Sequence, residues 1–69
     1  MNTNIEYLVR VPGDGDSKEY EITAPSVATA KAICDANEPA LDTEVELHTP
    51  VNGGYQFVSV RCVGHWYDN

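Results

Sequence analysis

Apolar side chains occupy every second position in two segments near the N-terminus. The first runs from Ile5 to Val11, and in the second Tyr20 and Ile22 alternate with polar residues. A period of two predicts strands with one buried face, here over residues 4–11 and 18–23. The intervening segment 12–17, PGDGDS, consists of turn-forming residues. We therefore expect the two strands to form an antiparallel hairpin.

A helical period begins after Pro25. Small and apolar residues recur at the spacing of one helical face: Val27, Ala30, Ile33 and Cys34. Ser26 is a residue type that caps helix N-termini, and Pro39 cannot continue a helix comfortably. The pattern predicts a helix over about residues 26–36. Lys31 and Asp35, four residues apart, are expected on its solvent side.

Alternation returns in the second half of the chain. Val45 and Leu47 alternate with polar residues and predict a third strand. The Asn52-Gly53 pair is a strong hairpin pattern, and residues 55–63 beyond it predict a fourth strand. Residues 64–69 are expected to form a short C-terminal tail that adds a few edge residues or folds back on the sheet.

The inward face of the fourth strand is ambiguous, because both of its faces carry apolar residues. One face holds Tyr55, Phe57, Ser59 and Arg61, and the other holds Gln56, Val58, Val60 and Cys62. We expect Val58, Val60 and Cys62 in the core, since that choice leaves Arg61 in water.

These elements predict one compact domain over residues 1–69. Its fold class is α+β, with a single antiparallel four-stranded sheet and one helix on one face, in the order β-β-α-β-β. The order of the strands within the sheet stays open.

Charge narrows the possible partners. The chain has 4 Lys or Arg residues against 11 Asp or Glu, a net charge of −7. Nucleic acid and anionic membranes are themselves negative, so direct binding to either is disfavoured. No apolar segment has the length of a membrane span or the flanks of a secretion signal, and the two cysteines are too few for a disulfide scaffold. A cytoplasmic protein with free thiols is expected.

The strand pattern also predicts where part of this charge lies. If the apolar positions of the strands face the helix, their glutamates face away from it: Glu19, Glu21, Glu44 and Glu46. Two residues along a strand span about 6.7 Å, close to the rise of about 6.8 Å over two phosphates of one B-DNA strand. Asp14 and Asp16 add charge at the first hairpin, and Asp35, Glu38 and Asp42 cluster at the end of the helix. The alternative is that these glutamates only solubilise the sheet and protect its edges.

No catalytic or metal-binding motif is present. Glu44 and Glu46 on an open face have no pocket to separate their pKa values. The segment 14–19 lacks the distal glutamate of a calcium loop, and the cysteines and histidines lack zinc-ligand spacing. We expect a non-enzymatic protein without a metal or cofactor. Trp66 and Tyr67 either close the core or form an exposed anchor for a protein partner.

The β-β-α run from Glu19 to Ala30 and the Asn52-Gly53 hairpin after Val45-Glu46-Leu47, in so short and acidic a chain, resemble the small phage-encoded anti-CRISPR proteins. Several of those proteins are acidic mimics of DNA. The resemblance implies a stoichiometric inhibitor, in the cytoplasm of a bacterial host, that blocks a basic nucleic-acid channel on a crRNA-guided surveillance complex. The alternatives are a phage structural or assembly module, which could be a homodimer, and an antitoxin-like module with a basic partner.

Overall fold

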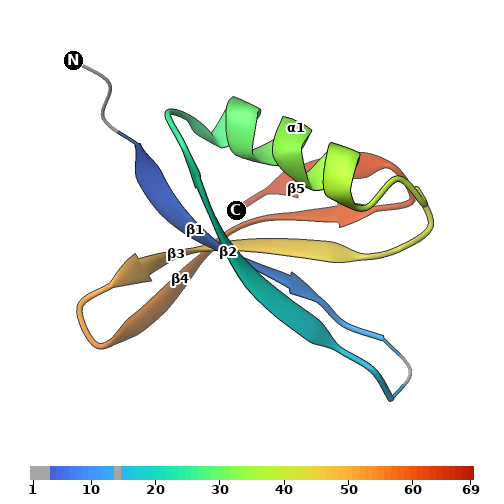
Figure 1. Cartoon of the computed structure of the whole chain (residues 1–69), viewed down its shortest axis with the longest axis horizontal. Coiled ribbons are helices and arrows are strands. Elements are labelled where there is room, and N and C mark those ends of the chain that lie inside the picture. The colour runs from blue at the N-terminus through green and yellow to red at the C-terminus, as the bar shows by residue number, and fades with distance from the viewer. Residues whose placement is uncertain (1–3, 14) are drawn as a thin grey trace.

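A computed structural model describes residues 4–13 and 15–69 of the chain. In this part of the chain, one helix packs on one face of a five-stranded antiparallel sheet (Figure 1). The elements are β1 (Ile5–Val11), β2 (Lys18–Ala24), α1 (Val27–Asn37), β3 (Val45–Val51), β4 (Gly54–Cys62) and β5 (His65–Asp68). The predicted α+β class with one antiparallel sheet and one helix is confirmed. The predicted count of four strands is wrong, because the expected tail contains a fifth strand.

The strand order is β2-β1-β3-β4-β5, and every neighbouring pair is antiparallel. The segment 12–17 joins β1 to β2 in a hairpin, as predicted, and Arg10 lies opposite Glu19. The sheet twists strongly, so the β1–β2 and β3–β4 hairpins cross and extend past the helix in different directions (Figure 1). Asp14 lies outside the described residues.

The fifth strand depends on a tight turn between β4 and β5. Val63 and Gly64 both have positive φ, at 49° and 79°. Two consecutive residues with positive φ are the requirement of the two-residue turn that best matches the twist of a hairpin. Trp66 then pairs with Arg61, and Tyr67 pairs with Val60. The predicted tail is therefore an edge strand of the sheet.

The helix forms over the predicted segment. The Ser26 hydroxyl accepts a hydrogen bond from the Thr29 amide at 3.2 Å, as expected of an N-cap. At the other end, the amide of Glu38 donates to the Cys34 carbonyl at 2.8 Å. Ala30 and Cys34 are fully buried against the sheet, and their small side chains let the backbone of α1 come close to it. The buried apolar core consists of Tyr7, Val9, Val11, Ala24, Ala30, Cys34, Val45 and Leu47.

The inward face of β4 differs from the prediction. Leu47 pairs with Ser59, but His48 pairs with Phe57, so Val58 is an extra residue in the ladder. Such a β-bulge interrupts the strict alternation of side chains. Ser59 and Arg61 are fully buried, while Val60 and Cys62 are only partly buried; of the three residues predicted in the core, Val58 packs against it. The prediction of Val60 and Cys62 in the core and Arg61 in water is wrong.

Two of the three guanidinium nitrogens of buried Arg61 donate to three hydrogen-bond acceptors, while its Nε is buried without a partner among the described residues. Arg61 donates to Asp35 Oδ1 at 3.0 Å and to the carbonyls of Ala40 and Thr43 at 3.0 and 3.1 Å. Asp35 also accepts a hydrogen bond from Trp66 Nε1 at 3.2 Å. Asp35, predicted on the solvent side of the helix, is half-exposed and ties α1 to β4 and β5. The network also holds the loop between α1 and β3.

Candidate functional site

The face of the sheet opposite α1 is the candidate functional site. We call it the helix-free face and define it by the residues that alternate with the core positions of each strand. Along β1, Tyr7 and Val9 point toward the helix, so Leu8 and Arg10 point away from it. Its charged members are Glu6, Arg10, Glu19, Glu21 and Glu46, and its apolar and aromatic members are Leu8, His48, Tyr55, Phe57, Val60 and Tyr67.

Arg10 lies between two of the predicted glutamates. In the sheet register it is opposite Glu19 on β2 and opposite Glu46 on β3. Its guanidinium is 2.8 Å from the Glu19 carboxylate and 3.7 Å from the Glu46 carboxylate. Glu46 also contacts His48 Nε2 at 3.0 Å. One guanidinium is thus shared by two carboxylates, which lowers the charge that either presents to a partner.

Glu6 and Glu21 are the strongest negative positions on the helix-free face. Both are exposed, and neither has an ion-pair partner among the described residues. Glu21 lies opposite Leu8, and Glu6 lies opposite Thr23, so the two carboxylates are diagonal neighbours across β1 and β2. Together with Ile22 and Thr23 they line an open depression of the surface.

Each of the four basic residues of the chain is within 4 Å of a carboxylate of its own chain. Besides Arg10, these ion pairs are Lys18–Glu38 at 2.9 Å, Lys31–Asp68 at 2.6 Å and Arg61–Asp35 at 3.0 Å. Asp35 and Glu38, two of the three acids predicted to cluster at the helix end, are partners in these ion pairs. The described acids without such a pair are Glu6, Asp16, Glu21, Asp42 and Glu44.

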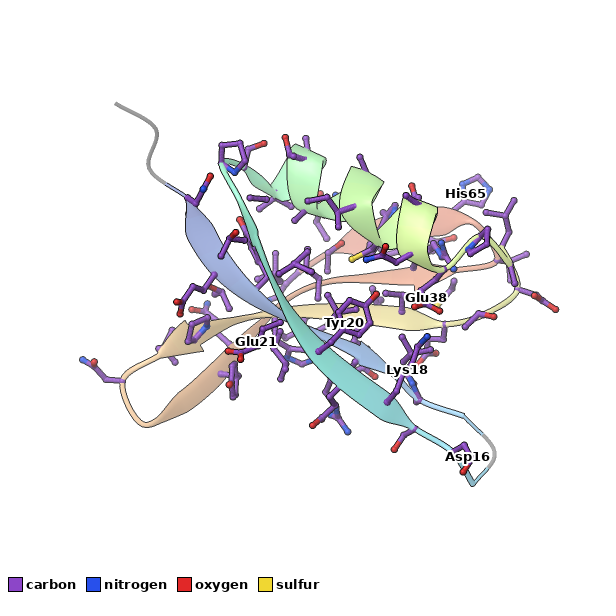
Figure 2. All side chains as sticks on the ribbon, in the orientation of Figure 1. Asp16, Lys18, Tyr20, Glu21, Glu38 and His65 are labelled. Carbon is purple, nitrogen blue, oxygen red and sulfur yellow. The ribbon has the colours of Figure 1, made fainter. Side chains whose placement is uncertain are left out.

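The Lys18–Glu38 pair includes Tyr20 and joins β2 to the end of α1. Tyr20 donates its hydroxyl proton to Glu38 Oε2 at 3.2 Å, and the three side chains lie together in Figure 2. Burial, reinforced by the nearby Glu38 carboxylate, raises the pKa of Tyr20. This cluster holds the helix on the sheet and gives Glu38, which is buried, a structural role.

The other predicted site residues lie in several places. Asp16 is exposed in the β1–β2 hairpin (Figure 2), and Glu44 is exposed just before β3. Trp66 packs against the core, whereas Tyr67 is 57% exposed on the helix-free face. Trp66 thus helps to close the core, and Tyr67 is the exposed member of the pair.

Two aromatic residues of the helix-free face were missing from the predicted site. Phe57 packs edge-on against His48, with ring centroids 5.6 Å apart, and Tyr55 is 52% exposed. The bulge at Val58 turns both toward the face opposite Ser59 and Arg61. Simple alternation puts all four residues on one face, so it predicts Tyr55 and Phe57 on the helix-free face only together with Ser59 and Arg61. A site predicted from charge leaves both aromatic residues out.

The titratable side chains of the helix-free face make few contacts with one another. Among the described residues, His48 and Glu46 form the one hydrogen-bonded pair of titratable side chains on this face apart from the Arg10 contacts, and they lie on an open sheet. Among residues 4–13 and 15–69, no three His, Cys, Asp or Glu side chains come together as metal ligands. No helix in the same ranges is long and apolar enough to cross a membrane.

Comparisons of the chain with known protein families, with curated proteins and with solved structures gave no match.

Proposed function

We propose that this protein is a non-enzymatic inhibitor that binds a basic, nucleic-acid-binding surface of another protein. The observation that supports this most is the distribution of charge. All four basic side chains are already paired within the chain, while Glu6 and Glu21 on the helix-free face have no such partner among the described residues. These two carboxylates are therefore available to a cationic partner.

A surface of this kind competes with nucleic acid by simple electrostatics. Proteins bind phosphates through Lys and Arg side chains, and the same cations pair with carboxylates. Alternate residues of β2, such as Glu19 and Glu21, repeat at about 6.7 Å, near the rise of two phosphates along one DNA strand. Long-range attraction speeds the encounter, and added salt weakens it.

The resemblance to small phage-encoded anti-CRISPR proteins makes a crRNA-guided surveillance complex the first target to test. Its DNA-binding channel would have to be positive to hold the DNA backbone. The inhibitor would work in the cytoplasm of a bacterial host and act by occupancy, one molecule for each channel.

Two variants test the proposal. Glu6→Lys/Glu21→Lys reverses the two unpaired charges of the helix-free face. Ala28→Lys/Ala32→Lys/Asp42→Lys makes the same change in net charge at exposed positions of α1 and of the loop before β3, and it serves as the matched control. Circular dichroism first establishes that both variants are folded. Each protein is then titrated into surveillance complexes bound to labelled duplex DNA.

We expect wild type and the control variant to displace the DNA, and the Glu6→Lys/Glu21→Lys variant to have lost most of this effect. In the absence of DNA, direct binding of wild type to the complex should weaken as salt rises from about 50 to about 300 mM, because exposed ion pairs are screened. Equal inhibition by wild type and the Glu6→Lys/Glu21→Lys variant would contradict the proposal.

A homodimeric structural or assembly module is the second candidate, favoured by the exposure of Tyr67 on the edge strand β5. Sedimentation equilibrium separates the two, because a monomer has a mass of 7.6 kDa and an obligate dimer twice that value.

A further inference from the structure

The helix-free face has two chemically different halves. The rows of the sheet run from aromatic or apolar residues on β4 and β5 to carboxylates on β1 and β2. One row contains Tyr67, Val60, Glu46, Arg10 and Glu19, and the next contains Phe57, His48, Leu8 and Glu21. A partner that covers the whole face must therefore both pack against aromatic rings and pair with carboxylates.

We propose that the helix-free face binds an arginine-rich segment of its partner protein, with guanidinium groups stacked on Tyr67 and Tyr55 and paired with Glu6 and Glu21. The proposal rests on the proposed function and specifies the partner chemistry. Arginine meets both demands of the face, because its planar guanidinium stacks on aromatic rings and also forms paired hydrogen bonds with carboxylates. Lysine is a more strongly hydrated point charge, and it pairs with carboxylates but stacks less well on aromatic rings.

The protein already contains a guanidinium beside carboxylates and, separately, a cation beside an aromatic ring. On the helix-free face itself, the Arg10 guanidinium is held between the carboxylates of Glu19 and Glu46. On the other face, Lys31 Nζ lies 5.9 Å from the centre of the Trp66 ring and pairs with Asp68. Tyr55 and Tyr67, at 52% and 57% exposed, have rings open to a further cation.

Charge argues against a second copy of the chain as the occupant. Stacking two helix-free faces would bring together two sets of four carboxylates, Glu6, Glu19, Glu21 and Glu46, with only one Arg10 in each set. Like charges placed opposite one another across strands or sheets are destabilising. A cationic partner removes that penalty and uses the same aromatic residues.

The test compares nine-residue peptides of arginine and of lysine, which carry equal charge, by isothermal titration calorimetry at fixed ionic strength. The variant Tyr55→Leu/Tyr67→Leu keeps apolar side chains and removes the rings. The variant Tyr55→Phe/Tyr67→Phe keeps the rings. Both positions are more than half exposed, so neither variant should unfold the chain.

We expect wild type and the Phe variant to bind the arginine peptide about tenfold more tightly than the lysine peptide, a difference of about 1.4 kcal/mol, because guanidinium groups stack on the two rings. The Leu variant should bind both peptides with similar affinity. Equal affinity of wild type for the two peptides would overturn the inference.

The two proposals fail in different ways. If Glu6→Lys/Glu21→Lys weakens binding of both peptides while wild type does not prefer arginine, the acidic surface binds cations and only the aromatic stacking is refuted. If that variant weakens neither peptide, both proposals fall. A wild-type dimer that dissociates on Tyr55→Leu/Tyr67→Leu substitution would identify a second copy as the occupant and would also overturn the inference.

Discussion

The guanidinium of Arg61 is fully buried beneath α1 and donates to Asp35 Oδ1 at 3.0 Å. This contact joins the helix to β4, and the same carboxylate oxygen accepts from Trp66 on β5. A charge removed from water needs a counter-ion and hydrogen bonds, and Asp35 supplies both. The Arg61–Asp35 pair holds α1 on the sheet and so stabilises the sheet that carries the helix-free face.

Asp35→Ala should therefore destabilise the protein by about 2 kcal/mol, the cost of leaving a buried charged donor without its partner. Urea unfolding followed by circular dichroism measures the change. Asp42→Ala, at an exposed loop acid without an ion pair among the described residues, is the control and should be close to neutral. Loss of less than about 0.5 kcal/mol in Asp35→Ala would show that the pair does not hold the layers together.

The Lys31–Asp68 pair predicts a dependence of stability on pH. Hydrogen bonds from Lys31 and from Ser59 lower the pKa of Asp68 in the folded protein. A lowered folded-state pKa contributes stability that is present above the unfolded pKa, about 3.9 for Asp, and is lost as pH falls through the folded value. Wild type should thus exceed Asp68→Asn in stability at pH 6, with the difference shrinking below about pH 4.

Urea titrations of both proteins between pH 6 and pH 2 measure this difference. Asp42→Asn is the matched control, because it removes a carboxylate at an exposed loop position that has no ion-pair partner in the described part of the chain. A difference between wild type and Asp68→Asn that stays constant across the range would refute the role of the ionised carboxylate.

The two cysteines should differ in reactivity. Burial, followed by the neighbouring Asp35 charge, raises the pKa of the Cys34 thiol to about 11, and the side chain is fully buried against the sheet. Cys62 is partly buried on β4. Since the thiolate is the reacting species, iodoacetamide at pH 8 should modify Cys62 in the native protein and Cys34 only after unfolding. Mass spectrometry of the digested protein locates the label, and rapid labelling of native Cys34 would contradict the burial.

The turn between β4 and β5 can be improved. Val63 has φ of 49° and is 74% exposed, so a β-branched residue is held in a left-handed conformation without compensating burial. Val63→Asn creates the Asn-Gly pair that such turns prefer and should stabilise the protein by about 1 kcal/mol. In a domain of this size that corresponds to a rise in Tm of about 4–8 °C.

Thermal unfolding measures this gain, and Val51→Asn in β3 is the control. Val51 is also exposed but lies in a strand, where asparagine is disfavoured, so its substitution should not raise the Tm. An unchanged or lower Tm in Val63→Asn would mean that the valine is not strained.

Much of the fold could be predicted from the sequence because β1, β2 and β3 keep strict alternation and α1 keeps a single helical face. Tyr20, Ile22, Val45 and Leu47 indeed point toward the helix, which puts Glu19, Glu21 and Glu46 on the opposite side. The bulge at Val58 could not be predicted, because its position is set by pairing with β3 rather than by residue type. The fifth strand was missed because valine occupies a turn position where asparagine or glycine is usual.

The burial of Arg61 was hidden for a different reason. Its acceptors come from Asp35, Ala40 and Thr43, which lie 18 to 26 residues away in the chain. The pairing of Arg10 with Glu19, in contrast, follows directly from the predicted hairpin, because a six-residue connection between Val11 and Lys18 places them opposite each other. The face on which each strand residue lies could thus be predicted for β1, β2 and β3. The ion pairs that leave some carboxylates without a partner among the described residues could not, because they depend on the folded structure.

Whether a surveillance complex can hold this protein and DNA at once is the most direct test of competition between them for one basic surface. Saturating amounts of protein and fluorescent DNA are added to the complex, and the species are separated by analytical ultracentrifugation. Competition for one surface predicts complexes that carry either the protein or the DNA, but not both. A stable assembly that contains the complex, the DNA and this protein together would contradict it.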